Sequence, residues 1–186
     1  MSVTRTERMP TIETARLILR PFAASDAPAV YEHVKGWDVA STTLNIPHPY
    51  EPSMADSWIR SHAISAAAGD GFTLAIIDRE SGGLIGSISL RLSPPHDRGE
   101  LGYWVGRPYW GRGYVTEAAA AVMKYGFETL GLNRIEAHYL SRNPASGRVM
   151  QKLGMTWEGR MREHVKKWGQ YEDVEACSIL RREYHG

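Results

Sequence analysis

The stretch Gly106-Arg-Pro-Tyr-Trp-Gly-Arg-Gly-Tyr-Val-Thr-Glu117 constrains the fold more than any other part of the chain. It lies between a predicted strand, residues 100–105, and a helix predicted over about 115–130. Gly111 and Gly113 allow a tight turn and remove side chains that would block a ligand. The start of the helix presents free N–H groups and the positive end of its dipole, which suit a phosphate or pyrophosphate. Two glycines before a helix also occur in turns that bind nothing, so both alternatives stay open at this point.

Two common phosphate-binding loops do not fit this stretch. It lacks the Gly-Lys-Ser/Thr of a P-loop, and it lacks three glycines at dinucleotide spacing. It also has no clean strand–helix–strand context, which disfavours a dinucleotide-binding Rossmann site.

Hydrophobic periodicity and capping residues divide the rest of the chain into alternating elements. Residues 1–12 are expected to be a loose lead-in, and residues 36–51 a loop rich in proline, glycine and asparagine. Together with 100–105, strands are predicted over 16–22, 72–77, 84–92, 134–140, 155–166 and 171–182. Besides 115–130, helices are predicted over 26–35, 53–68 and 143–153. This order predicts a single α+β domain over 1–186, with a mixed, mostly antiparallel sheet of about seven strands flanked by about four helices.

Composition excludes several classes of protein. The formal net charge is +1 and the charges are interspersed, so nucleic acid is not an expected partner. No apolar run approaches the roughly 20 residues that a membrane span needs. The single cysteine, Cys177, is expected to fill the core, and the start of the chain lacks a signal-like apolar stretch, which favours the cytoplasm. The histidines show no metal-ligand spacing, so no metal is expected.

Three segments resemble the GNAT superfamily of N-acetyltransferases. The stretch Trp110-Gly-Arg-Gly-Tyr-Val115, followed by Thr-Glu-Ala, is similar to the family's acyl-CoA pyrophosphate loop, in the form typical of the branch resembling ribosomal-protein alanine (Rim-type) acetyltransferases. Residues 143–155, Asn-Pro-Ala-Ser-Gly-Arg-Val-Met-Gln-Lys-Leu-Gly-Met, resemble a helix of the family, and residues 14–21 resemble its opening strand. Trp110 and Val115 depart from the usual polar and small residues of the loop, but backbone N–H groups bind the phosphates there.

The resemblance implies the GNAT fold and transfer of an acetyl group from acetyl-CoA to a primary amine, by direct attack in a ternary complex. The alternative is a non-catalytic module that senses acetyl-CoA. Asn143 is expected to cap its helix and to reach the pantetheine arm. The residues expected to contact the donor are Trp104, Val105, Gly106, Trp110, Gly111, Arg112, Gly113, Tyr114, Val115, Thr116 and Asn143.

Glu100 is the candidate general base, because it precedes Trp110 by the spacing found in GNAT enzymes with a glutamate on this strand. The alternative is an exposed carboxylate paired with Arg98 or Arg91. In many relatives a tyrosine seven residues after the asparagine protonates the leaving thiolate, and here Met150 stands at that position. Ser146, one turn earlier, or a water is the candidate replacement.

Acceptor contacts are expected from the loop 36–51 and from the last two strands. The candidate residues are Trp37, Thr43, Tyr50, His164 and Trp168, with Thr42 and Tyr171 beside them. Their aromatic rings suit an amine or a peptide, and they suit a cover for the core equally well. The acceptor is expected to be a small molecule or a protein N-terminus, and the protein a monomer or a homodimer.

Overall fold

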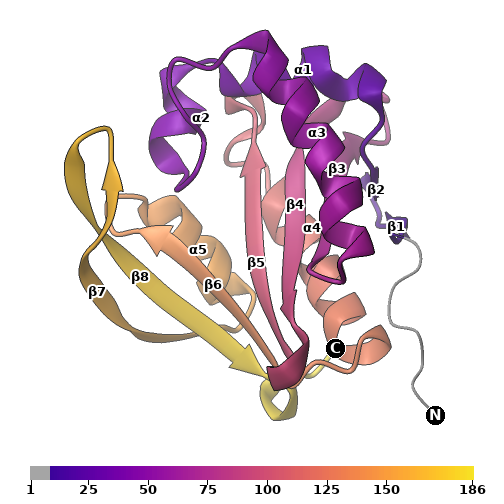
Figure 1. Cartoon of the computed structure of the whole chain (residues 1–186). Helices are drawn as coiled ribbons and strands as arrows, with labels where there is room; N and C mark the ends of the chain where they lie inside the picture. The colour runs from indigo at the N-terminus through magenta and orange to yellow at the C-terminus, as the bar shows by residue number, and fades with distance from the viewer. Residues whose placement is uncertain (1–8) are drawn as a thin grey trace.

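The computed structural model describes residues 9–186, which build one eight-stranded sheet with helices on both faces (Figure 1). The strand order is β1-β2-β3-β4-β5-β6-β8-β7, and every neighbouring pair is antiparallel except β5 and β6. The strands are β1 (Ile12–Glu13), β2 (Leu17–Pro21), β3 (Gly71–Asp78), β4 (Leu84–Ser93), β5 (Arg98–Val105), β6 (Arg134–Leu140), β7 (Thr156–Lys167) and β8 (Gln170–Leu180). The predicted α+β fold with a mixed, mostly antiparallel sheet is confirmed.

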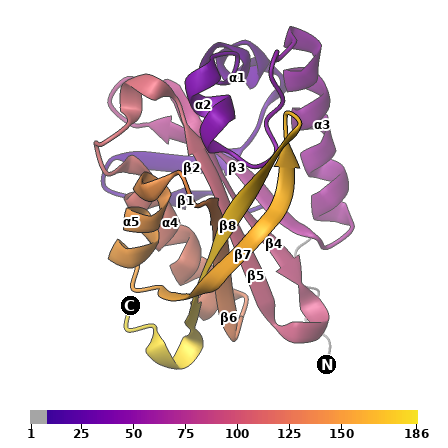
Figure 2. The ribbon, with the colours of Figure 1, turned by 90° about the vertical axis from the view of Figure 1, so that its left-hand side faces the viewer.

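The helices divide between the two faces of the sheet, as the view in Figure 2 shows. One face carries α1 (Ala27–Val34), α2 (Trp37–Thr42) and α3 (Pro52–Ala67). The other carries α4 (Tyr114–Lys124), which continues into a π-helical turn (Tyr125–Thr129), and α5 (Pro144–Lys152). Short 3-10 turns occupy Ala24–Asp26, Pro94–His96, Arg107–Tyr109 and Arg181–Glu183.

Each face of the sheet has its own apolar core. The larger core packs the α4 side of the central strands against that helix and includes Leu90, Leu101 and Met150. The smaller core lies under α1 and α3 and includes Trp104. Because successive side chains of a strand point to opposite faces, Leu101, Tyr103 and Val105 face α4 and α5, whereas Glu100, Gly102 and Trp104 face α1 and α3.

The pairing between β5 and β6 is short. It covers Arg98–Leu101 of β5 and Arg134–Ala137 of β6, and beyond that point the two strands diverge (Figure 1). Each strand keeps its outer partner much further, β5 with β4 and β6 with β8. The sheet therefore opens into a V between two firmly paired halves.

Strand alternation decides which backbone groups face this opening. Gly106 donates its N–H to the carbonyl of Ile85 at 2.9 Å, which places it in a hydrogen-bonded pair with β4. In an antiparallel ladder hydrogen-bonded and non-hydrogen-bonded pairs alternate, so the N–H groups of Val105 and Tyr103 point away from β4. They point into the V, where β6 no longer pairs with them.

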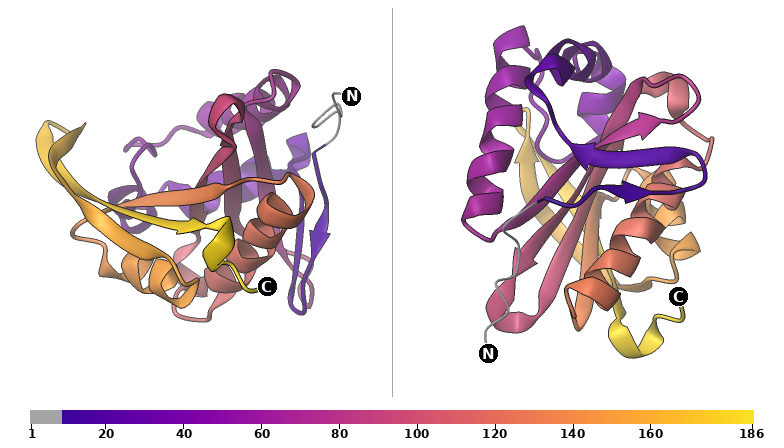
Figure 3. Two further views of the ribbon diagram at one scale, coloured as in Figure 1. Left: turned by 90° about the horizontal axis from the view of Figure 1, so that it is seen from below. Right: turned by 90° about the vertical axis from the view of Figure 1, so that its right-hand side faces the viewer.

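The structure differs from the predicted elements in three places. The predicted loop 36–51 contains helix α2, which begins after Gly36 and is too short to show a helical period. The loose lead-in expected over 1–12 lies outside the described residues as far as residue 8. Ile12, by contrast, belongs to β1 and pairs with Leu19 of β2, so the sheet has one strand more than predicted (Figure 3). The helix predicted to Leu130 changes to π-helical geometry at Tyr125.

Within residues 9–186, no helix combines the length and the apolar character that crossing a membrane requires.

Candidate active site

Two cavities meet where β5 and β6 diverge. One has a volume of about 590 Å³ and lies on the side of α1 and α3, and the other has about 370 Å³ and reaches the glycine-rich turn before α4. Five residues line both cavities: Thr42, Thr43, Tyr103, Trp104 and Ser146. The two cavities therefore share one junction at the split of the sheet, and a group entering from one side can meet a group entering from the other.

The glycine-rich turn has the backbone geometry that its sequence predicts. Gly111 and Gly113 have φ of 75° and 77°, a region that favours glycine, and Gly113 directly precedes α4. A Cβ on Gly111 would meet no atom within 4 Å, and one on Gly113 would meet only Arg16, at 3.6 Å. The space beside both glycines is thus open, and the first N–H groups of α4 face no helical partner. This geometry fits an anion such as a pyrophosphate.

The turn is held against the opening strands by a charge pair that the sequence did not reveal. Arg16 donates from Nε to Glu117 at 2.7 Å and from Nη1 to the carbonyl of Arg112 at 3.0 Å. Thr14 adds a hydrogen bond to Glu117 at 2.7 Å. Glu117 lies in the first turn of α4, and Arg16 compensates its negative charge there. Both residues belong to recognised sequence segments, but their contact joins positions about a hundred residues apart.

Most of the residues expected to contact the donor line the smaller cavity. They are Trp104, Val105, Trp110, Gly111, Gly113, Tyr114, Val115, Thr116 and Asn143. Gly106 and Arg112 are not among its lining residues. At Gly106 a Cβ would lie 2.5 Å from Nδ1 of His33, so this glycine makes room for a histidine. Arg148 and Lys152 of α5 also line this cavity, and the sequence analysis had not singled them out as site residues.

Glu100 lies on the wall of the larger cavity between two basic partners. Nδ1 of His138 on β6 donates to Oε1 of Glu100 at 3.1 Å, and Arg91 of β4 pairs with Oε2. The hydrogen bond from His138, helped by Arg91 against the opposing effect of burial, lowers the pKa of Glu100 to about 2. The same hydrogen bond raises the pKa of His138. A carboxylate this acidic stays ionised at neutral pH and is by itself a weak base.

His138 was missed by the sequence analysis, although its place in the sheet is regular. The register pairs Leu101 with Ala137, so His138 follows directly at the point where the strands diverge. No hydrogen bond to its Nε2 is found among the described residues, and the side chain lines the larger cavity. Strand alternation alone places His138 on the same face of β6 as Glu136. It does not show that β5 lies beside β6, so the sequence could not bring His138 next to Glu100.

Asn143 and Ser146 form a small network at the junction. The Asn143 side chain caps α5, accepting from the N–H of Ser146 at 3.4 Å, so its predicted capping role is confirmed. Its amide donates to the carbonyl of Thr42 at 3.1 Å and to Oγ of Ser146 at 3.2 Å. The start of α5 is therefore tied to the end of α2 across the opening.

The acceptor candidates fall into two groups. Thr43 and Tyr50 line the larger cavity. Trp37 and Trp168 instead pack together at the surface, with ring centroids 4.4 Å apart and His48 beside them, and His164 is exposed on β7. Trp37, Trp168 and His164 line neither cavity.

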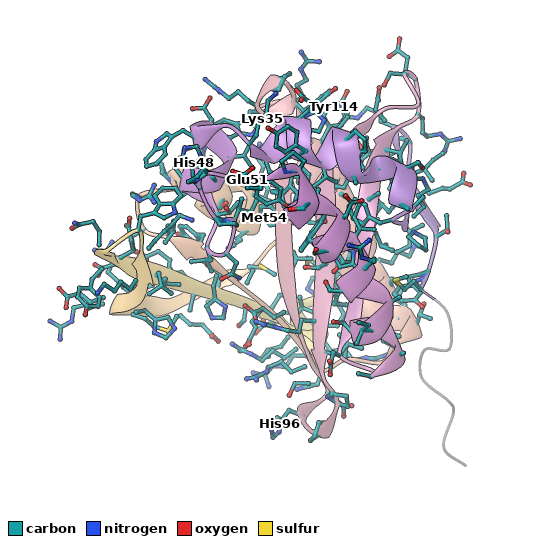
Figure 4. All side chains as sticks on the ribbon, turned by 45° about the horizontal axis from the view of Figure 1, so that its top comes forward. Lys35, His48, Glu51, Met54, His96 and Tyr114 are labelled. Carbon is teal, nitrogen blue, oxygen red and sulfur yellow. The ribbon has the colours of Figure 1, made fainter. Side chains whose placement is uncertain are left out.

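The segment from α2 to α3 is fastened over the larger cavity. Nζ of Lys167 donates to the carbonyl of Ile46 at 3.2 Å, and Arg142 donates to the carbonyl of Ser41 at 2.7 Å. Figure 4 shows His48 of this segment and Tyr114 of the glycine-rich turn at one end of the molecule, and His96 at the opposite end.

Comparisons with known proteins agree on one family. A model described as an acetyltransferase (GNAT) domain matches residues 16–156. An uncharacterised N-acetyltransferase, p20 of Bacillus licheniformis, is 33% identical over 181 residues, which cover 96% of this chain and all of that protein. A GNAT-family acetyltransferase structure from Bacillus anthracis superposes with a TM-score of 0.83 at 28% identity, covering 94% and 100% of the two chains. The RimL ribosomal L7/L12 α-N-protein acetyltransferase, solved with coenzyme A, gives a TM-score of 0.83 at 20% identity, with 92% and 98% covered, and shares the fold.

The hydrogen bond between Glu100 and His138 predicts a titration that can be observed directly. In the wild-type protein, His138 should titrate above the ordinary value near 6.5, because the ionised carboxylate stabilises the imidazolium. Replacing Glu100→Gln removes that charge and leaves burial, so the pKa of His138 should fall below the wild-type value. NMR titration of the ring protons measures both. The matched variant Glu172→Gln, whose carboxylate pairs with Arg142, should leave the His138 titration unchanged, and equal titration of wild type and Glu100→Gln would contradict the pairing.

Proposed function

Because the chain belongs to the GNAT family of N-acetyltransferases, we propose that it moves an acetyl group from acetyl-CoA to a primary amine by direct attack in a ternary complex. The observation that carries the proposal is the junction of the two cavities at the split of the sheet. Two substrates that enter from opposite sides can be held with their reacting atoms in contact, which removes most of the entropic barrier to a bimolecular step.

The donor is proposed to occupy the smaller cavity. Its pyrophosphate would be held by the N–H groups of residues 111–116, at open glycines and at the N-terminus of α4. Arg148 and Lys152 supply positive charge on the opposite wall. The amide groups of the pantetheine arm suit the unpaired edge of β5 in the manner of an added strand. The complex of RimL with coenzyme A supports a donor of this class.

The N–H of Val105 is proposed to stabilise the oxygen that becomes negative during transfer. Strand alternation turns this N–H into the V, and the carbonyl of Val105 is occupied by the indole N–H of Trp110 at 2.8 Å. The backbone of Val105 is therefore held in place before any substrate binds. A fixed donor that needs no reorganisation is the most effective kind of oxyanion stabiliser.

We propose that Glu100 acts as base together with His138. With one ring nitrogen held by the carboxylate at 3.1 Å, His138 presents Nε2 to the larger cavity, where it can take a proton from the amine directly or through a water. Glu100 stays ionised and stabilises the imidazolium that results. Ser146, at the junction, is proposed to contact the sulfur side of the reaction.

The acceptor is proposed to be a small amine or a protein N-terminus, held in the larger cavity by residues that include Thr43 and Tyr50. The named activity of RimL on a protein N-terminus supports the second class. Trp37, Trp168 and His164 lie outside the cavity and are proposed to contact the parts of an acceptor that protrude from it.

A screen of amines tests the proposed activity. Acetyl-CoA is incubated with the protein and a panel of peptides, amino acids, polyamines and amino sugars, and thiol release is followed together with the mass of the product. At least one amine should gain an acetyl group on nitrogen. Tight coenzyme A binding with no turnover of any amine would favour the non-catalytic sensor, and product acetylated on oxygen would favour transfer to a hydroxyl.

Gly113→Asp should weaken acetyl-CoA binding at least about tenfold, roughly 1.4 kcal/mol. The new carboxylate would enter the space proposed for the pyrophosphate and repel it, and it would also force an unfavourable φ of 77° on a non-glycine residue. Gly82→Asp is the matched control, because Gly82 has φ of 70° in a turn away from both cavities. Calorimetric titration should show the loss in the first variant alone; equal affinities in two folded variants would remove the phosphate site from this turn.

The pH dependence of the rate tests the paired base, using an acceptor whose amine is neutral across the range studied. The wild-type rate should rise with pH as His138 loses its proton. Glu100→Gln should lower the plateau about 10²–10⁴-fold and move the rise to lower pH, because the pKa of His138 falls. His138→Gln should lose a similar factor, and the double variant little more, since groups that act as a unit are not additive. A wild-type profile in both single variants would show that the pair has no catalytic role.

A further inference from the structure

The five residues that line both cavities differ in what their side chains can donate. The hydroxyl of Thr42 lies 3.0 Å from the carbonyl of Val39, and the hydroxyl of Thr43 lies 3.2 Å from that of Ala40. Trp104 offers an indole, and Ser146 an aliphatic hydroxyl that already accepts from Asn143. Tyr103 carries the one phenol of the five, and a phenol is by far the strongest acid among these groups.

Tyr103 is placed so that its hydroxyl can turn toward a bound molecule. It extends from β5 toward α5, and its Oη lies 3.5 Å from the carbonyl of Ser146, at the outer limit of a hydrogen bond. Among the described residues no shorter hydrogen bond holds this hydroxyl. The ring itself is firmly packed against the larger core, so the oxygen is fixed in position while its proton can change partner.

The sulfur that leaves in acetyl transfer takes up a proton at this junction, and Met150, seven residues after Asn143, does not supply one. Met150 is 2% exposed and lies in the core, where its thioether has no proton to donate. On the basis of the proposed function, we propose that Tyr103 is the residue that protonates the leaving sulfur, with Ser146 beside it as the group that orients its hydroxyl.

The step balances with the groups already named. The amine nitrogen forms a bond to the acetyl carbon and gives a proton to Nε2 of His138. The carbon–sulfur bond breaks, its electron pair goes to sulfur, and the proton on Oη of Tyr103 forms the thiol. The phenolate is then reprotonated from water, and His138 releases its proton to water, so the enzyme returns to its starting state.

The burial of Tyr103 supports this role. Removal from water raises the pKa of Tyr103 to about 12, so the phenol keeps its proton at neutral pH and regains it promptly after donating it.

Replacing Tyr103→Phe tests the proposal by kinetics. With acetyl-CoA and one good amine, kcat should fall about 10²-fold while KM for acetyl-CoA stays within about threefold. Acetyl-seleno-CoA has the same shape but a leaving group that needs no proton, so with this donor the deficit should largely disappear. Tyr184→Phe is the matched control: Tyr184 stacks on Phe127 and lines neither cavity, so the loss of its hydroxyl should affect both donors equally and little. An equal deficit with both donors in Tyr103→Phe would overturn the proposal.

Titration of bound coenzyme A tests the same contact without any acceptor. A hydroxyl that donates to the sulfur stabilises the thiolate, so the midpoint of thiolate absorbance should rise by about one pH unit in Tyr103→Phe and stay unchanged in Tyr184→Phe. Equal midpoints in wild type and Tyr103→Phe would refute the contact with sulfur. If the amine screen finds no turnover, the proposed function fails, and this titration still decides whether Tyr103 meets the thiol.

Discussion

The short parallel pairing between β5 and β6 is the constraint on which the rest of the structure depends. It joins the two halves of the sheet through Arg98–Leu101 and Arg134–Ala137 and then ends. Gly99 lies within it, and its missing side chain leaves room for Leu90 and Leu132, which would lie 2.8 and 2.9 Å from a Cβ there. Both halves remain paired on their outer sides, so the opening has rigid walls. Each wall contributes different side chains to the junction.

The charges around the opening follow from this arrangement. Glu100 on β5 and His138 on β6 come from different halves of the sheet, and their hydrogen bond crosses the point where the halves separate. Arg91 on β4 holds the other carboxylate oxygen. Because the carboxylate is shared by two basic groups, its own basicity is suppressed and that of the imidazole is increased. For this reason the proposed base is the pair of Glu100 and His138, and not the carboxylate alone.

Local pattern was sufficient for most of the architecture and for most residues that line the smaller cavity. Apolar alternation and capping residues located seven strands and four helices, and the positive φ of Gly111 and Gly113 follows from a turn that leads directly into a helix. Most residues that line the smaller cavity are close in sequence, within one strand, one turn and one helix start, so their proximity in space needs no knowledge of the fold. Asn143, Arg148 and Lys152 are among the exceptions, because they come from the segment of α5. Helix α2 and strand β1 were not predicted, because neither is long enough to show the hydrophobic periodicity of a helix or a strand.

The sequence by itself determined the family, the mostly antiparallel sheet and the glycine-rich turn before α4, because each depends on patterns of residues that are neighbours along the chain. Only the tertiary structure decided the contact of His138 with Glu100, the contact of Arg16 with Glu117, and the contact of Tyr103 with Ser146. These contacts join residues separated by tens of positions, and they depend on strand order and on where one pairing stops. The local sequence does not indicate where the pairing of β5 with β6 ends, because that position is set by how the two halves of the sheet pack.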